Sequence, residues 1–174
     1  QVSAFRIDVV MPGPEELFAE VYRDHTGLMV KTAHAFTNSA ADRDDLFQEI
    51  LVSVWQALPQ FKGQAKLSTY VYRVAHSCAL IWKRSRQRYQ HKIDRFALET
   101  PELTSSPEQR ERVAWLYAKI QQLPPVDRTL ILLHLDKLSY ADMAEITDLT
   151  ESNIGVRLHR IKQQLTKLSE ESPQ

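Results

Sequence analysis

Apolar residues recur along this chain at the spacing of α-helices rather than of strands. The first pattern extends from Leu17 to Phe36 and predicts one helix, or two helices if Gly27 interrupts it. A second pattern predicts a helix that begins at Asp42 or Arg43 and stops at Pro59. Its first turn is acidic, which the helix dipole favours. The start of the chain therefore predicts helices that pack through one apolar side each.

A third helix is predicted after a loop at residues 61–66, in which Gly63 is the hinge. Ser68 or Thr69 is the expected N-cap. The apolar residues that follow at helical spacing predict a buried stripe of Val71, Val74, Ala75, Cys78, Ile81 and Trp82. The opposite face is then expected to carry Arg73, His76, Ser77, Lys83 and Arg84.

Residues 94–107 are predicted to link two helical units. They contain two prolines, a Thr-Ser-Ser cluster and renewed acidity, which is a composition typical of a linker. Helical spacing resumes near Glu108, and a further helix is predicted to start at Val126 after two prolines. A linker of this length leaves two compact units free to sit some distance apart on a long ligand.

Residues 138–165 have the pattern of a helix-turn-helix. Ser139 and Asp142 resemble a capping box, residues 147–149 form the predicted turn, and Thr150 is the expected cap of the last helix. The inner stripe of that helix is predicted to be Ile154, Leu158, Ile161 and Leu165. Its outside and flanks are predicted to carry Ser152, Asn153, Val156, Arg157, His159 and Arg160. Such a helix enters the major groove of DNA; the alternative is a helical hairpin with a polar face.

Charge is balanced overall but segregated along the chain. The sequence has 22 basic and 22 acidic residues. Residues 15–49 contain eight acidic residues against three cations, whereas residues 62–92 contain eight cations and no acid. This division suggests an acidic face for a protein and a basic face for a polyanion. One side of the second predicted helix carries Asp45, Gln48 and Glu49. This group is either a docking face for a partner or an ordinary solvent-exposed surface.

The basic segment is also rich in aromatic residues. Its rings are interleaved with the cations and comprise Phe61, Tyr70, Tyr72, Trp82 and Tyr89. Rings beside a cationic track can stack the bases of an opened strand, and the loop at 61–66 could hold a flipped-out base. The alternative is a solvated basic helix whose aromatic residues belong to the core.

Other chemistry finds little support. Cys78 is the only cysteine, so a reducing compartment fits and an internal disulfide is excluded. His76 and Cys78 are too few, and on different faces, to predict a metal site. His25, His34 and His134 lie among apolar residues, where a hydrogen-bonded core histidine is expected. No cofactor is predicted, and without a membrane-length apolar run or a signal peptide a cytoplasmic protein is expected.

Taken together, the motifs resemble those of the extracytoplasmic-function (ECF) sigma factors, small members of the bacterial sigma-70 family. Residues 45–49, Asp-Leu-Phe-Gln-Glu, followed by Trp55, are similar to the family's helix that binds the β′ clamp coiled coil of RNA polymerase. Phe61-Lys62-Gly63 and residues 68–75 are similar to the part that melts and reads the −10 element. Leu123-Pro124 and the helix-turn-helix are similar to the module that reads the −35 element.

The resemblance implies an all-α protein of two small helical domains joined by a flexible linker. Residues 1–93 would be region 2, residues 94–108 the linker, and residues 109–174 region 4. It implies core-polymerase contacts at Asp45, Leu46, Gln48, Glu49 and Trp55. It implies −10 contacts at Phe61, Lys62, Gly63, Lys66, Tyr70, Tyr72, Arg73, His76, Ser77, Lys83 and Arg84. It implies −35 contacts at Ser152, Asn153, Gly155, Val156, Arg157, His159 and Arg160.

The implied function is that of a promoter-specificity subunit without catalysis of its own, because polymerase supplies the active site. The implied partners are core RNA polymerase through its β′ clamp and β flap, promoter DNA and an anti-sigma factor. Two alternatives remain: a helix-turn-helix regulator that binds duplex DNA without polymerase, and a sigma mimic that titrates an anti-sigma factor.

Some residues depart from the family pattern. Ser77 and Ile81 stand where many members have Asn and Asp, so base readout late in the −10 helix is expected to differ. Gly155 and Val156 stand where Lys or Arg and Ser are common, and Asp148 replaces the usual turn glycine.

Overall fold

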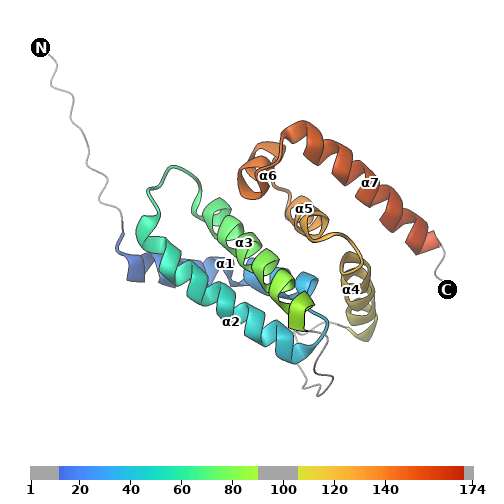
Figure 1. Ribbon diagram of the computed structural model, residues 1–174, viewed down its shortest axis with the longest axis horizontal. Helices are drawn as coiled ribbons and strands as arrows, with labels where there is room; N and C mark the ends of the chain where they lie inside the picture. The colour runs from blue at the N-terminus through green and yellow to red at the C-terminus, as the bar shows by residue number, and fades with distance from the viewer. Residues whose placement is uncertain (1–11, 90–105, 171–174) are drawn as a thin grey trace, which may run out of the picture.

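The computed structural model describes residues 12–89 and 106–170, and within these ranges the regular structure is helical (Figure 1). The elements are α1 (Pro14–Phe36), α2 (Ala40–Ala57), a 3-10 turn η1 (Leu58–Gln60), α3 (Leu67–Tyr89), α4 (Pro107–Ile120), α5 (Pro125–Leu135), α6 (Tyr140–Thr147) and α7 (Glu151–Glu170). The predicted all-α class is confirmed.

The first three helices form a bundle in which each packs on the other two. The bundle core is made of fully buried side chains that include Val21, Met29, Leu46, Ile50 and Val54. α1 is one continuous helix, because its apolar stripe stays buried on both sides of Gly27. Gly27 therefore does not break it.

The boundaries of α2 and α3 differ slightly from those that the sequence predicts. α2 begins at Ala40, two or three residues earlier than predicted, because the Ser39 side chain accepts a hydrogen bond from the backbone N–H of Asp42 and caps the helix. α3 begins at Leu67, so Ser68 and Thr69 lie in its first turn and are not its cap. Ile81 was expected in the core, but 65% of its surface is exposed, since nothing in the described chain packs over it.

The second half contains α4 to α7, and its helix-turn-helix has the predicted local structure. Ser139 caps α6 through the N–H of Asp142, and Thr150 accepts from the N–H of Asn153 at the start of α7. Asp148 has a φ of 57°, the left-handed conformation that ends α6. The inner stripe of α7 is buried at Ile154, Leu158 and Ile161. In α4, by contrast, Val113 is exposed and not part of the core.

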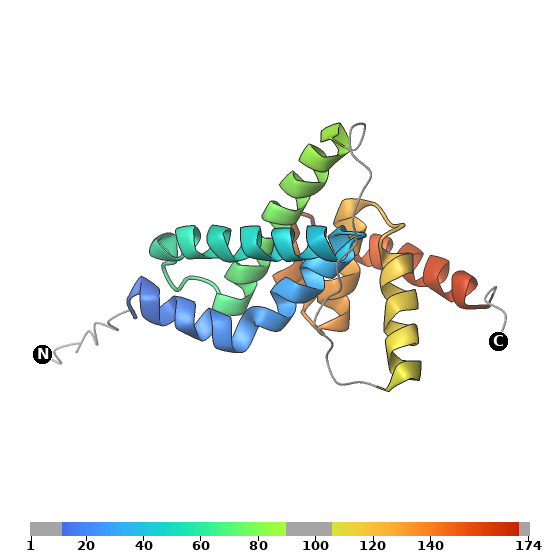
Figure 2. The same cartoon turned by 90° about the horizontal axis from the view of Figure 1, so that it is seen from below.

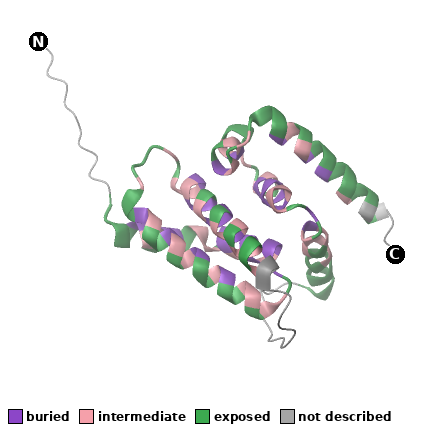
Figure 3. Ribbon diagram, in the orientation of Figure 1, coloured by how far each residue is buried: buried purple, intermediate pink, exposed green. Residues whose placement is uncertain are grey.

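The two halves pack against each other and share one hydrophobic core. α3 lies along α6 and α5, and α1 lies against α5 (Figures 1 and 2). α5 is the central element of this contact, and residues 128–133 are all buried (Figure 3). The sequence predicted separable units and gave no sign of this packing. Most of the predicted linker, residues 94–108, lies outside the described residues. Its last two residues, Pro107 and Glu108, belong to the first turn of α4.

Arg128 of α5 is a buried cation at the junction of the halves. Its Nε donates to the carbonyl of Leu123 at 2.8 Å, and its two terminal nitrogens donate to the carbonyls of Gln121 and Ala35. Its guanidinium also stacks on the Phe36 ring, 5.6 Å from the centroid. Because the Ala35 carbonyl belongs to α1, this side chain joins the second half to the first.

Candidate nucleic-acid interface

The acidic cluster of α2 lies on one wall of a groove between α2 and α3. Asp45, Gln48 and Glu49 are all exposed there, and the groove has a volume of about 740 Å³. The opposite wall comes from α3 and includes Trp82 and Arg86. Carboxylates above an apolar floor suit a partner that presents both cations and apolar side chains.

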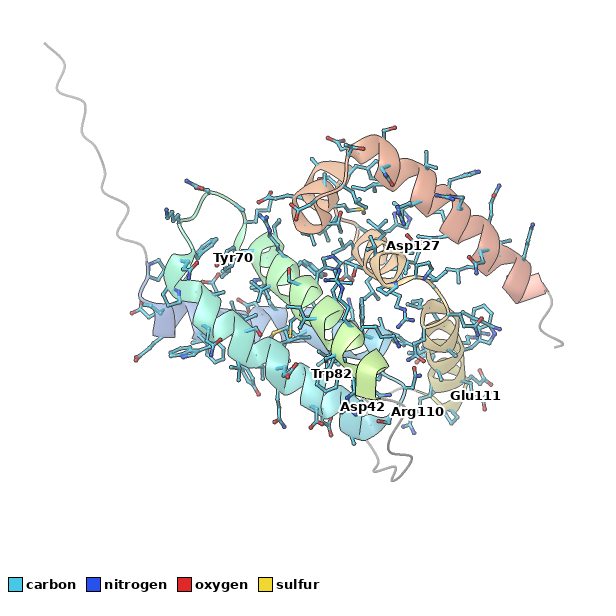
Figure 4. All side chains as sticks on the ribbon, in the orientation of Figure 1. Asp42, Tyr70, Trp82, Arg110, Glu111 and Asp127 are labelled. Carbon is cyan, nitrogen blue, oxygen red and sulfur yellow. The ribbon has the colours of Figure 1, made fainter. Side chains whose placement is uncertain are left out.

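Arg86 closes one end of this groove. Its guanidinium lies 2.7 Å from a carboxylate oxygen of Asp42 and 3.7 Å from one of Asp45. It also stacks over the Trp82 ring at 4.8 Å (Figure 4, where Asp42 and Trp82 are labelled). The basic segment thus contributes a cation to the acidic face, a contact that the segregation of charge along the sequence does not predict.

Two members of the predicted polymerase-binding set differ in position. Leu46 is fully buried in the bundle core, so it supports the face from beneath and cannot contact a partner directly. Trp55 is 43% exposed and packs edge-on against Phe18, with 5.1 Å between ring centroids. The sequence analysis missed Val52, whose side chain is exposed between the acidic cluster and Trp55 and lines the groove.

The loop at residues 61–66 turns at a glycine and lies over a pair of aromatic rings. Gly63 has a φ of 68°, a left-handed conformation that glycine adopts without strain. Lys62 and Gly63 are exposed, while the rings of Phe61 and Tyr70 lie 5.1 Å apart beneath them. The hydroxyl of Tyr70, which is labelled in Figure 4, donates to the carbonyl of Ala57 at 2.8 Å and anchors the loop to the end of α2.

Further along α3, the predicted DNA-reading face divides into a free part and a covered part. Ser77 and Arg84 are exposed, and Lys83 is half-buried. Tyr72 and His76 are buried beneath α5 and the turn that follows it, contrary to the expected outward position of His76. The reason is the packing of the second half, which the sequence pattern of α3 alone does not contain.

Each covered side chain has a partner in the second half. The Tyr72 hydroxyl donates to Asp136, and His76 Nδ1 lies 2.7 Å from the hydroxyl of Thr129. Burial lowers the pKa of His76 to about 4, so the ring is neutral near pH 7, and burial with the hydrogen bond to Asp136 raises the pKa of Tyr72. Arg73 reaches toward Asp148 at 3.5 Å and stays exposed.

The outer face of α7 is open. Ser152, Asn153, His159 and Arg160 are exposed, and Val156 is 56% exposed. A Cβ added to Gly155 would lie 3.5 Å from the Tyr140 ring, an ordinary contact distance. The recognition helix therefore presents a polar and basic surface with one apolar side chain at its centre.

Arg157 was expected on the outer face of α7, but its side chain is held by contacts within the protein. Its guanidinium donates to Asp127 of α5 at 2.7 Å and to Asn153 one turn earlier at 2.9 Å. Asp127, labelled in Figure 4, is mostly buried at this contact. Arg157 thus ties the recognition helix to α5, and Arg160 is left as the freely exposed arginine of α7.

The contacts between the halves were not found by sequence reasoning. They involve Gln121, Arg128, Thr129 and Asp136, whose partners lie 53 to 105 residues away in the chain. No local pattern signals them, because periodicity and caps report only on neighbours in sequence.

Comparison with known families gives two matches in chain order. A profile for sigma-70 region 2 matches residues 21–89, which contain the α2 face, the loop and α3. A profile for sigma-70 region 4 matches residues 114–165, which contain the helix-turn-helix. The chain belongs to the sigma-70 family.

Its relatives place this sigma factor in the ECF group. It is 26% identical to the RNA polymerase sigma factor YlaC of Bacillus subtilis over 90% of this chain and 94% of YlaC. It is 24% identical to the ECF sigma factor SigW of the same organism over 93% of this chain and 94% of SigW. Both alignments thus extend over at least 90% of this chain.

Solved structures agree on the fold. CnrH in complex with the cytosolic domain of CnrY has a TM-score of 0.68 at 18% identity, covering 91% of both chains. The sigma factor RpoE from Bartonella quintana, in complex with the anti-sigma factor NepR, has a TM-score of 0.68 at 17% identity, covering 91% of this chain and 99% of RpoE. Within the described residues of the present chain, no helix is long and apolar enough to cross a membrane.

Proposed function

We propose that this ECF sigma factor is a promoter-specificity subunit that binds core RNA polymerase and directs it to start transcription at promoters with its −10 and −35 elements. The observation that carries the proposal is the presence of three separate surfaces on one chain. They are the acidic groove of α2, the basic aromatic loop before α3, and the open face of α7. In this role, residues 1–93 act as region 2 and residues 109–174 act as region 4, and residues 94–108 link the two regions.

Docking on polymerase is assigned to the α2 groove. Asp45, Gln48 and Glu49 provide exposed acceptors, while Val52 and Trp55 provide apolar area beside them. This combination fits a cationic, amphipathic coiled coil such as the β′ clamp. The charges would orient the partner as it approaches, and the apolar side chains would supply most of the binding energy. Region 4 is expected to contact the β flap in the same complex.

The −10 element is assigned to the loop and to α3. Lys62 and Lys66 would contact the backbone of the opened strand, and the tilted pair of Phe61 and Tyr70 would support a base lifted out of the stack. Ser77 and Arg84 continue this track along the exposed side of α3. The basic content of the loop favours a phosphate backbone over a neutral ligand.

The −35 element is assigned to α7. Asn153 and Arg160 are placed to contact base edges or phosphate in the major groove, and Val156 is placed to contact a thymine methyl group. No step of covalent chemistry is assigned to the protein, since the polymerase supplies the active site.

An anti-sigma factor is the further partner we propose. RpoE, one of the similar solved structures, is in complex with such a factor. Binding to core polymerase and sequestration by an anti-sigma factor would both take place in the cytoplasm.

Co-elution with core polymerase tests the docking face, with a matched pair of charge reversals on α2. Asp45→Lys and Glu49→Lys should each weaken core binding about tenfold or more, because each places a cation where the partner presents one. Asp44→Lys is the control, since Asp44 is also exposed on α2 but does not line the groove. Equal core affinity for Asp45→Lys, Glu49→Lys and the wild type would overturn the assignment.

A further inference from the structure

The part of α3 assigned to the −10 element is turned inward onto the second half of the same chain. Tyr72 retains 9% of its exposed surface and His76 retains 6%. α3 packs against α6 and α5, and no other chain is needed to cover it. Two residues that would face an opened strand are thus occupied by contacts within the protein.

Asp136 is the centre of this contact. It caps the C-terminal end of α5, where the next residue, Lys137, turns the chain with a φ of 60°. One carboxylate oxygen accepts from the ammonium of Lys31 on α1, and the other accepts from the hydroxyl of Tyr72 on α3. A single carboxylate of the second half therefore binds two helices of the first.

Other polar contacts also join the two halves. His76 meets Thr129, and the side-chain amide of Gln121 donates to the carbonyls of His34 and Thr37 at 2.8 and 2.7 Å. At the rim, Lys66 lies 3.8 Å from Asp142. Hydrogen bonds between buried groups specify one arrangement, because each would be left unpaired in another.

The closed arrangement conflicts with promoter binding. The −10 and −35 elements lie about 25 base pairs apart, which is about 85 Å at 3.4 Å per base pair. α3 and the helix-turn-helix are in direct contact here, so one chain in this arrangement cannot place them on both elements. The chain between Tyr89 and Ser106 could extend to at most about 60 Å, enough to let the halves separate.

We infer that this sigma factor closes on itself, with Asp136 latching region 4 over the −10 face of α3, and that the latch must open before the promoter is read. This inference rests on the proposed function for its consequence, but the latch itself is a property of the free chain. An anti-sigma factor is not required for the closure, because all of its contacts come from residues of this protein.

A distance measurement on the free full-length protein tests the latch. Spin labels are attached at Gln56→Cys on α2 and Gln163→Cys on α7, both exposed positions away from the contact, in a chain carrying Cys78→Ala. The wild-type latch should give one short, narrow distance distribution. Asp136→Lys, which places a cation beside Lys31, should give a longer and broader one. Asp24→Lys is the control, since Asp24 pairs with Arg23 on the same helix and contributes nothing to the boundary.

Chemical modification of His76 provides a second readout that needs no label. The rate at which diethylpyrocarbonate modifies His76, measured by mass spectrometry, should rise roughly tenfold in Asp136→Lys. The reason is that losing the two hydrogen bonds of Asp136 shifts the equilibrium between the closed and open chain toward the open form by about that factor. Exposed His159 should react at the same rate in both proteins. A wild-type chain that shows a long distance and rapid His76 modification overturns the closure. A short distance that Asp136→Lys leaves unchanged overturns the role of Asp136.

Added core polymerase separates the latch from the proposed function. Where co-elution shows binding, the spin–spin distance should lengthen, and a bound chain that keeps the short distance would overturn the requirement for opening. A chain that fails to bind core refutes the proposed function, while its latch is still judged by the measurements on the free protein.

Discussion

Arg157 and Arg160 are three residues apart on α7, yet the structure gives them different tasks. Arg160 is exposed, whereas Arg157 is held by Asp127 and Asn153. Replacing Arg160 by Ala should therefore remove a contact to DNA. Replacing Arg157 by Ala should instead remove the tie between α7 and α5, and leave the Asp127 carboxylate without its partner.

The two expected effects differ in kind and in size. A lost phosphate contact lowers the slope of log affinity against log salt by about 0.9, so the penalty of Arg160→Ala should shrink about 3.5-fold between about 50 and 200 mM salt. An ionised group that loses its partner at a partly buried site costs about 1–3 kcal/mol in the free energy of unfolding. Because the side chains of Arg157 and Asp127 keep 31% and 17% of their exposure, we expect about 1–2 kcal/mol for Arg157→Ala.

The assay pairs promoter binding by the reconstituted holoenzyme, titrated over this salt range, with urea unfolding of the free protein. Arg160→Ala should change the salt slope and keep the unfolding midpoint. Arg157→Ala and Asp127→Ala should lower the midpoint by similar amounts and keep the slope. If Arg157→Ala flattened the salt slope as Arg160→Ala does and left unfolding unchanged, the assignment of Arg157 as a positioning residue would be refuted.

Three further predictions concern stability. Arg128→Ala should cost about 3–5 kcal/mol in urea unfolding, since three carbonyls and the Phe36 ring lose a buried partner; a cost below about 1 kcal/mol would contradict its bridging role. Gly27→Ala should stabilise by about 0.5–1 kcal/mol, because an added Cβ meets nothing within 4 Å in α1, whereas Gly63→Ala should destabilise at its φ of 68°; the same sign for both would be inconsistent with these conformations. Burial lowers the pKa of His34 and of His76 to about 4, so the unfolded chain binds more protons than the folded chain, and the free energy of unfolding should fall as the pH drops from about 6.5 to about 4. A double variant, His34→Gln with His76→Gln, should lose this pH dependence in unfolding curves. An unaltered pH dependence would contradict the assignment to these two histidines.

Much of the helical framework could be predicted because it depends on neighbours in sequence. The spacing of Ile154, Leu158 and Ile161 locates the inner side of α7, and the caps at Ser139 and Thr150 fix the helix-turn-helix. The same local rules apply to any amphipathic helix with polar caps. They identify elements and their apolar sides, and in this chain they were sufficient for the fold class.

The contact between the halves could not be predicted in this way. His76 lies at a polar position of the α3 pattern, and it is buried because the second half, including Thr129, packs against it. Ile81 occupies an apolar position and is exposed, since no element covers that side of α3. Which polar face meets which depends on three-dimensional packing between distant segments, for which helical periodicity carries no information.

Run-off transcription tests the central claim most directly. Core RNA polymerase is incubated with fragmented genomic DNA of the host, with and without this protein, and the transcripts are mapped. The proposed function predicts new, discrete transcripts whose start sites share −10 and −35 sequences, and their loss with Asp45→Lys but not with Asp44→Lys. The absence of new transcripts, together with binding of the free protein to duplex DNA, would contradict it and establish a regulator that acts without polymerase.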